Sequence, residues 1–191
     1  VLFSPYVMHE LYLKPFEIAI RESTPWTVMS SYNKVNGEYA SENSLLLDSI
    51  LRRRWGYKGL VMTDWFGGQD AVKQTVAGND LLMPGLKKQR KALKDAVENG
   101  KLSTHILDRN VQRILELIIK TPRFQQYDYT NTVDLGANAR ISRMAAAEGM
   151  VLLKNDNLTL PLNKSQTGRI ALFGISSYDF IPGGTGSGDV N

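Results

Sequence analysis

Gly59-Leu60-Val61-Met62-Thr63-Asp64-Trp65 is a short apolar run that ends on a carboxylate and an indole. Such a run, without polar alternation, is typical of a strand buried on both faces in a parallel sheet. A carboxylate after such a strand is costly to keep unless it is solvated, paired or functional. From the residues alone, Asp64 is explained equally well as the N-cap of the next helix and as a catalytic group.

Helices and strands alternate on both sides of this run. Apolar residues at spacings of three and four predict helices at 4–21, 42–55, 70–77, 87–99 and 103–120. The first of these is expected to be divided at Pro15, and the second to be capped by Ser41. Further strands are predicted at 26–31 and 81–83. This alternation favours a parallel α/β fold. A closed (β/α)8 barrel has eight strands and typically about 250 residues, so three strands can form only part of one. Residues 1–120 are therefore predicted to form the C-terminal part of a TIM-type barrel.

The remaining residues change character. We interpret 121–165, which are rich in polar and turn-forming residues, as an interdomain linker that contains a helix at 139–149. Apolar runs at 150–154 and 169–175 predict two further strands. Residues 166–191 are predicted to begin a second α/β sandwich domain. Because the first residue is Val1 rather than Met, we expect an internal fragment of a longer protein.

Composition excludes several classes of protein. The chain is 42% apolar and 22% charged, as in soluble globular proteins, and no apolar run approaches the roughly 20 residues of a membrane helix. The basic groups at 52–54 and 87–94 are expected to be solvated helix faces, with no nucleic acid as partner. Without cysteine there is neither a disulfide nor a thiolate metal site. Three aspartates without metal-ligand spacing are expected to cap helices or face solvent: Asp70, Asp80 and Asp108.

Several long blocks carry a resemblance to a known family. They occur in order at 30–37 (SSYNKVNG), 51–57 (LRRRWGY), 59–65 (GLVMTDW), 77–85 (AGNDLLMPG), 146–155 (AAEGMVLLKN) and 160–162 (LPL). These blocks strongly resemble glycoside hydrolase family 3, over nearly the whole chain. The resemblance implies a two-domain enzyme that hydrolyses glycosides without a metal or cofactor.

The resemblance assigns roles residue by residue. It implies that Asp64 is the nucleophile, that Trp65 lines the sugar subsite, and that Tyr32 hydrogen-bonds the nucleophile or the substrate. Met29 resembles a further subsite residue, and Ser187 of the glycine-rich loop resembles a sugar contact. The acid/base glutamate and a Lys-His pair of the family are expected outside this chain, in the remainder of the same enzyme.

The predicted function is that of a retaining, exo-acting β-glycosidase, first of all a β-glucosidase. It would act on β-linked oligosaccharides or aryl and alkyl glycosides through a covalent glycosyl-enzyme intermediate on Asp64. Three alternatives stay open: a β-xylosidase of this family, a β-N-acetylglucosaminidase of this family, and a non-catalytic carbohydrate-binding fragment. The residues leave open whether the protein forms a homodimer and whether it is periplasmic, secreted or cytoplasmic.

Overall fold

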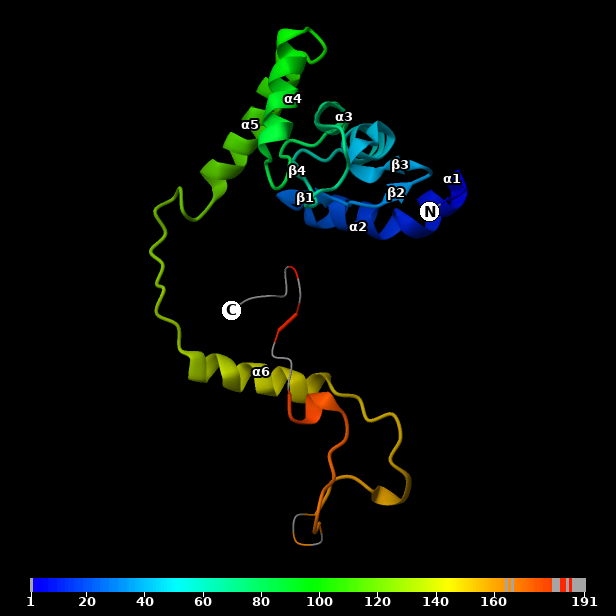
Figure 1. Ribbon diagram of the computed structural model, residues 1–191, viewed down its shortest axis with the longest axis vertical. Helices are drawn as coiled ribbons and strands as arrows, with labels where there is room; N and C mark the ends of the chain where they lie inside the picture. Colours follow the sequence, from blue (N-terminus) through cyan, green and yellow to red (C-terminus); the bar gives the residue numbers. More distant parts are fainter. Residues whose placement is uncertain (1, 164, 166, 180–182, 185, 187–191) are drawn as a thin grey trace. The chain divides into compact units, whose positions relative to one another are not determined.

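The chain forms two compact units, Val1–Tyr129 and Thr130–Asn191 (Figure 1). The computed structural model describes residues 2–163, 165, 167–179, 183, 184 and 186. Each unit is described by itself below. Among the described residues, the first unit contains the strands and nearly all of the helices, and the second contains one long helix.

Two parallel strands lie at the centre of the first unit. Strand β1 (Thr27–Ser30) pairs with β4 (Leu60–Thr63) so that Met29 lies opposite Met62. The third predicted strand is reduced to a single parallel bridge between Met62 and Leu81. The order β1, β4, Leu81 follows the chain, as expected of successive strands in a parallel sheet.

A small hairpin follows β1. Strands β2 (Lys34–Val35) and β3 (Glu38–Tyr39) are antiparallel and are joined by Asn36 and Gly37. Both turn residues have positive φ, 52° and 89°, which is the geometry of the tight turn that this dipeptide favours.

The first predicted helix is divided, as Pro15 indicated. Helix α1 (Pro5–Val7) runs into the π-helix η1 (Met8–Tyr12), and α2 (Lys14–Ser23) begins anew with the proline in its first turn. Proline has no backbone N–H, and the first turn is where that loss is tolerated.

The other helices of this unit follow the predicted pattern, with one error at a cap. They are the 3-10 turn η2 (Ala40–Glu42), the π-helix η3 (Leu45–Arg54), α3 (Ala71–Ala77), α4 (Lys87–Glu98) and α5 (Thr104–Lys120). The predicted N-cap at Ser41 is wrong, because η3 begins after Ser44. The Ser41 side chain is buried and donates instead to the Gly67 carbonyl, at 2.8 Å.

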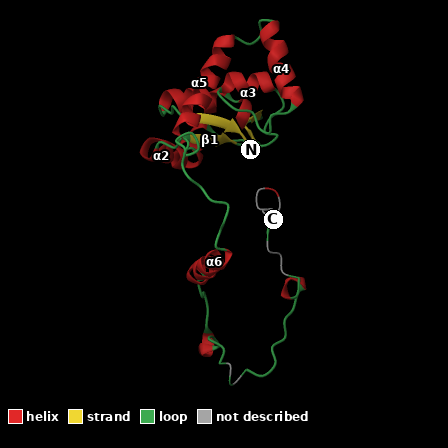
Figure 2. Ribbon diagram, turned by 90° about the vertical axis from the view of Figure 1, so that its left-hand side faces the viewer, coloured by secondary structure: helices red, strands yellow, loops and turns green. Residues whose placement is uncertain are grey.

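The core packs one face of β4 against helices that precede and follow it in the chain. Figure 2 shows α2, α3, α4 and α5 around the parallel strands. Val61 is fully buried, and it belongs to a cluster that α2, η3 and α3 share. The buried members of this cluster are Met8, Ile20, Leu47, Ile50, Leu51, Trp55, Tyr57, Val61 and Ala77.

The second unit contradicts two predicted strands. Its long helix α6 (Leu135–Gly149) is followed, among the described residues, only by the short turns η4 (Asp156–Leu158) and η5 (Ile175–Ser177). The strands predicted at 150–154 and 169–175 are therefore wrong. A strand needs a partner for its N–H and C=O groups and a surface on which to bury a face. Among the described residues these runs have neither, and Leu153 and Phe173 are 92% and 90% exposed.

Candidate active site

Asp64 directly follows β4 at its carboxyl end. Its backbone N–H donates to the Ser30 carbonyl at 2.8 Å, which extends the strand pairing by one residue. Side chains alternate along a strand, and Val61 and Thr63 face the buried side at 0% and 1% exposure. Continued alternation directs Asp64 to the face that Met62 shares with Met29. The carboxylate is half-buried there, and therefore accessible to a substrate.

A four-residue turn carries the chain away from Asp64. The Gly67 N–H donates to the Asp64 carbonyl at 3.1 Å, and the Trp65 N–H donates to the Asp64 side-chain oxygen Oδ1 at 2.6 Å. The Trp65 and Phe66 rings meet edge to face, with centroids 6.1 Å apart and an 82° interplanar angle. The turn thus places a carboxylate and two aromatic rings side by side.

The helix after this turn has a different N-cap. Asp70 accepts hydrogen bonds from the Val72 and Lys73 N–H groups at 2.9 and 3.1 Å, and so caps α3. The explanation of Asp64 as the cap of the next helix is therefore wrong. The expectation that Asp70 is a capping residue is confirmed.

The loop between Asp64 and α3 is held by the turn η2. Glu42 accepts hydrogen bonds through Oε1 from the Gln69 and Asp70 N–H groups, at 2.6 and 2.9 Å. Ser41 donates to the Gly67 carbonyl close by. A carboxylate that accepts two backbone N–H groups makes charge-assisted hydrogen bonds, so this loop has a defined position.

Three other predicted site residues, Met29, Tyr32 and Trp65, lie in or just after the central strands. Met29, Tyr32 and Trp65 expose 58%, 63% and 58% of their surface. A Cβ placed on Gly67 would lie 3.4 Å from the Tyr32 Cα, so the loops after β1 and β4 are in close contact. Within the described part of the chain, no hydrogen bond joins the Tyr32 hydroxyl to Asp64. Ser187 lies outside the described residues.

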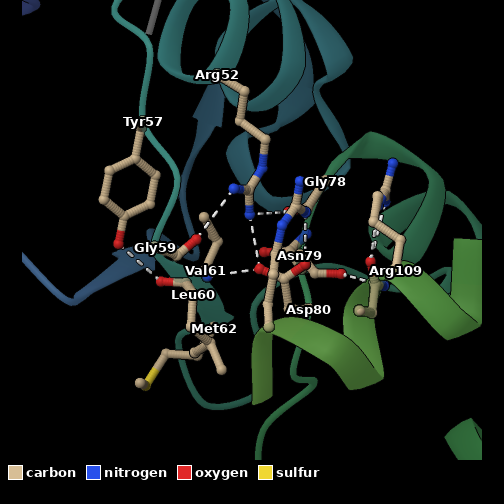
Figure 3. Close-up of polar contacts among 12 residues, drawn as sticks. Arg52, Tyr57, Gly59, Leu60, Val61, Met62, Gly78, Asn79, Asp80 and Arg109 are labelled. Atoms are coloured by element: carbon tan, nitrogen blue, oxygen red, sulfur yellow. Dashed lines mark hydrogen bonds and ion pairs between the residues drawn. The ribbon is translucent and has the colours of Figure 1, made fainter. Parts of the chain in front are cut away.

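A buried ion-pair network lies beneath the strands (Figure 3). The Asp80 side chain is fully buried, and its Oδ2 accepts from Arg52 at 2.6 Å and from the Val61 N–H at 2.9 Å. Its Oδ1 accepts from Arg113 at 2.9 Å. Burial lowers the pKa of Arg52, and burial also raises the pKa of Tyr57 to about 12. The network joins η3, β4 and α5.

This network corrects two sequence predictions. Asp80 neither caps a helix nor faces solvent, and Arg52 is only 8% exposed although its basic neighbours suggested a solvated helix face. Sequence reasoning missed the pair because its partners lie 28 positions apart, and helical periodicity does not register contacts at that separation.

Within the described ranges, the chain carries neither a metal-site cluster nor a membrane-spanning helix. There, no three His, Cys, Asp or Glu side chains come together as a metal site would require. No helix in the same ranges is long and apolar enough to cross a membrane.

Residues 3–117 match the family model described as the glycosyl hydrolase family 3 N terminal domain. The chain belongs to glycoside hydrolase family 3. The family resemblance noted in the sequence blocks is thereby confirmed.

Relatives and solved structures agree with this membership. The chain is 44% identical over 170 residues to thermostable beta-glucosidase B from Acetivibrio thermocellus, covering 87% of this chain and 22% of that protein. It is 39% identical over 190 residues to beta-glucosidase B from Emericella nidulans, covering 96% of this chain and 22% of that protein. Beta-glucosidase 3B from Thermotoga neapolitana, solved with alpha-D-glucose, is 43% identical with a TM-score of 0.85, covering 100% of this chain and 27% of that chain. The chain thus spans about a quarter of the length of the proteins it matches.

Proposed function

We propose that this chain belongs to a retaining, exo-acting β-glucosidase in which Asp64 is the nucleophile. The observation that carries the proposal is the position of Asp64. It is a half-buried carboxylate at the carboxyl end of a parallel strand, it caps no helix, and exposed Trp65 follows it. In parallel α/β barrels the active site lies at this end of the strands. The relatives named beta-glucosidase supply the substrate class.

The chemistry suits these groups. The Asp64 carboxylate attacks the anomeric carbon and forms an ester, while a second carboxyl group protonates the departing glycosidic oxygen. Water, deprotonated by that second group, then cleaves the ester and restores the free carboxylate. The Trp65 indole offers an apolar surface to the C–H face of the sugar. We propose that the second carboxyl group comes from the rest of a longer enzyme.

The same proposal covers the architecture. Strands β1 and β4 and the bridge at Leu81 are assigned to successive strands of a (β/α)8 barrel, with residues 1–120 as its C-terminal part. Residues 121–165 are assigned to the interdomain linker, and 166–191 to the start of the second domain. The parallel order of the three segments supports this assignment.

Replacing Asp64 tests the nucleophile. Asp64→Ala in the full-length enzyme is expected to lower kcat for an aryl β-glucoside by at least about 1000-fold, since the ester cannot form. A 2-fluoroglucoside is expected to label the peptide that contains Asp64. Asp70→Ala is the matched control, because it removes a carboxylate from the same loop, and its kcat is expected to stay close to wild type.

Two results would contradict the proposal: full activity of the Asp64→Ala enzyme, or a covalent label on a different peptide. Aryl β-xylosides and aryl N-acetyl-β-glucosaminides, measured beside the glucoside, test the substrate class. A higher kcat/KM for either of them would replace the glucosidase assignment.

A further inference from the structure

Asn79, labelled beside Asp80 in Figure 3, is a fully buried amide with hydrogen bonds to three elements of the first unit. Its Oδ1 accepts from the Ser30 hydroxyl at 2.7 Å, and its Nδ2 donates to the Ser41 and Gln74 carbonyls at 2.6 and 2.7 Å. A buried polar side chain is costly to keep unless it is bonded in this way. The three partners belong to β1, η2 and α3, so this one amide joins all three.

The three partners of this amide hold the backbone of Asp64 from two sides. The Asp64 N–H donates to the Ser30 carbonyl at 2.8 Å, at the end of β1. On the other side, the Asp64 carbonyl accepts from the Gly67 N–H at 3.1 Å. The Gly67 carbonyl in turn accepts from the Ser41 hydroxyl and from the Gln74 side-chain amide. Every partner of the buried amide therefore lies within two hydrogen bonds of Asp64.

The loop between these contacts has a backbone conformation that its surroundings impose. Phe66 and Gly68 have positive φ, 58° and 93°. A bulky residue such as Phe66 adopts that region only where the surrounding structure over-determines it. A Cβ on Gly68 would clash with the Ser41 hydroxyl, 2.6 Å away, and with the Gln74 amide. The loop thus packs directly against two of the groups that Asn79 holds.

We propose that Asn79 is a positioning residue for Asp64, whose carboxylate it holds in place through the end of β1 and through the loop after β4. The inference rests on the proposed role of Asp64 as the nucleophile. Because Asn79 is fully buried, it contacts no substrate and acts through its three partners. The rate of attack is sensitive to small displacements of a reacting group. The loss of these contacts is therefore expected to slow the attack rather than to weaken substrate binding.

The deciding variant is Ser30→Ala, which removes the hydroxyl bonded to Asn79 and keeps the backbone of β1. Labelling of the full-length enzyme by a 2-fluoroglucoside measures the attack of Asp64 directly. It separates the rate constant at saturation from the concentration that gives half of that rate. We expect Ser30→Ala to lower the saturating rate constant about tenfold and to leave the half-saturating concentration within about twofold. Ser30→Thr keeps a hydroxyl and is expected to retain most of the rate.

Thr75→Val is the matched control. Thr75 is buried and donates its hydroxyl to the Ala71 carbonyl at 2.8 Å, so the variant loses a comparable hydrogen bond outside the Asn79 contacts. Its labelling rate is expected to stay within about twofold of wild type.

A double-mutant cycle tests whether Ser30 acts through Asn79. In enzyme that carries Asn79→Ala, the further change Ser30→Ala is expected to lower the labelling rate by less than about twofold, because both changes break the same hydrogen bond. A further tenfold loss would contradict the inference. If Asn79→Ala does not fold, the Ser30 and Thr75 variants decide by themselves.

Three outcomes among those variants would overturn the inference: an unchanged labelling rate in Ser30→Ala, an equal loss in Thr75→Val, or a loss in Ser30→Thr as large as in Ser30→Ala. An equal loss in Thr75→Val would show that the Ser30 hydroxyl contributes only to stability. Failure of the proposed function gives a different result. Wild-type enzyme would then carry no label on the peptide that contains Asp64, whatever the variants show.

Discussion

At the scale of single residues, the loop that follows Asp64 is held by the side chain of Glu42. Glu42 accepts two backbone hydrogen bonds from the loop that Asp64 begins, and thereby fixes the course of that loop toward α3. A displacement of a reacting group by about 1 Å can lower a catalytic rate 100-fold. Glu42 is therefore expected to influence kcat through the position of Asp64, the proposed nucleophile.

Replacing Glu42 tests this positioning role. Glu42→Ala is expected to lower kcat for an aryl β-glucoside about tenfold with little change in KM, since the two N–H groups lose their acceptor. Glu42→Gln keeps a carbonyl oxygen in place and is expected to retain most of the activity. The measurement is steady-state kinetics on folded, full-length enzyme. An unchanged kcat with only a lower Tm in Glu42→Ala would show a purely structural role.

The positions of these residues could be predicted from the sequence to different degrees. Asp64 and Trp65 follow an apolar run and lie in a family block, so their place after a buried strand was predictable. Phe66 lies next to them, yet its φ is a property of the folded turn and leaves no pattern in the sequence. Glu42 reaches a segment 27 and 28 positions later, and a contact at that separation depends on how η2 packs against the loop.

At the scale of elements, Asp80 holds a third segment to the central strands. It joins Arg52 of η3 and Arg113 of α5, and it receives the Val61 N–H of β4. Only one bridge, at Leu81, pairs this segment with β4 in the ladder. The side-chain contacts of Asp80 therefore hold this segment against β4, to which few backbone hydrogen bonds join it.

Removing this carboxylate is expected to be severe. Asp80→Ala leaves the Arg52 charge buried without its partner, and the free energy of unfolding is expected to fall by about 3–5 kcal/mol. The matched control is Asp48→Ala, which breaks the exposed pair with Arg53 and is expected to cost less than about 1 kcal/mol. Urea unfolding of both variants measures the difference. Equal losses in the two variants would mean that burial does not strengthen the Asp80 interactions.

At the scale of the whole molecule, the two units differ in how their helices are supported. The buried cluster lies entirely within residues 8–77 of the first unit. In the described part of 130–191, no residue is buried. The alternation of helix and strand in residues 1–120 was predictable because the periodic apolar residues of the sequence are those that a packed core buries there. After residue 149 the apolar runs found no partner, and the predicted strands did not form.

This difference predicts how the segments behave when separated. A peptide of residues 130–191 is expected to show no cooperative thermal transition, because burial of an apolar face supplies most of a helix's stability. Helix α6 has 15 residues, a length at which an isolated helix is marginal in water. Far-UV circular dichroism during heating measures this, with segment 1–129 as the comparison because it contains the buried cluster. A sharp transition in the peptide would show that residues 130–191 form a core of their own, contrary to their exposure in the structure.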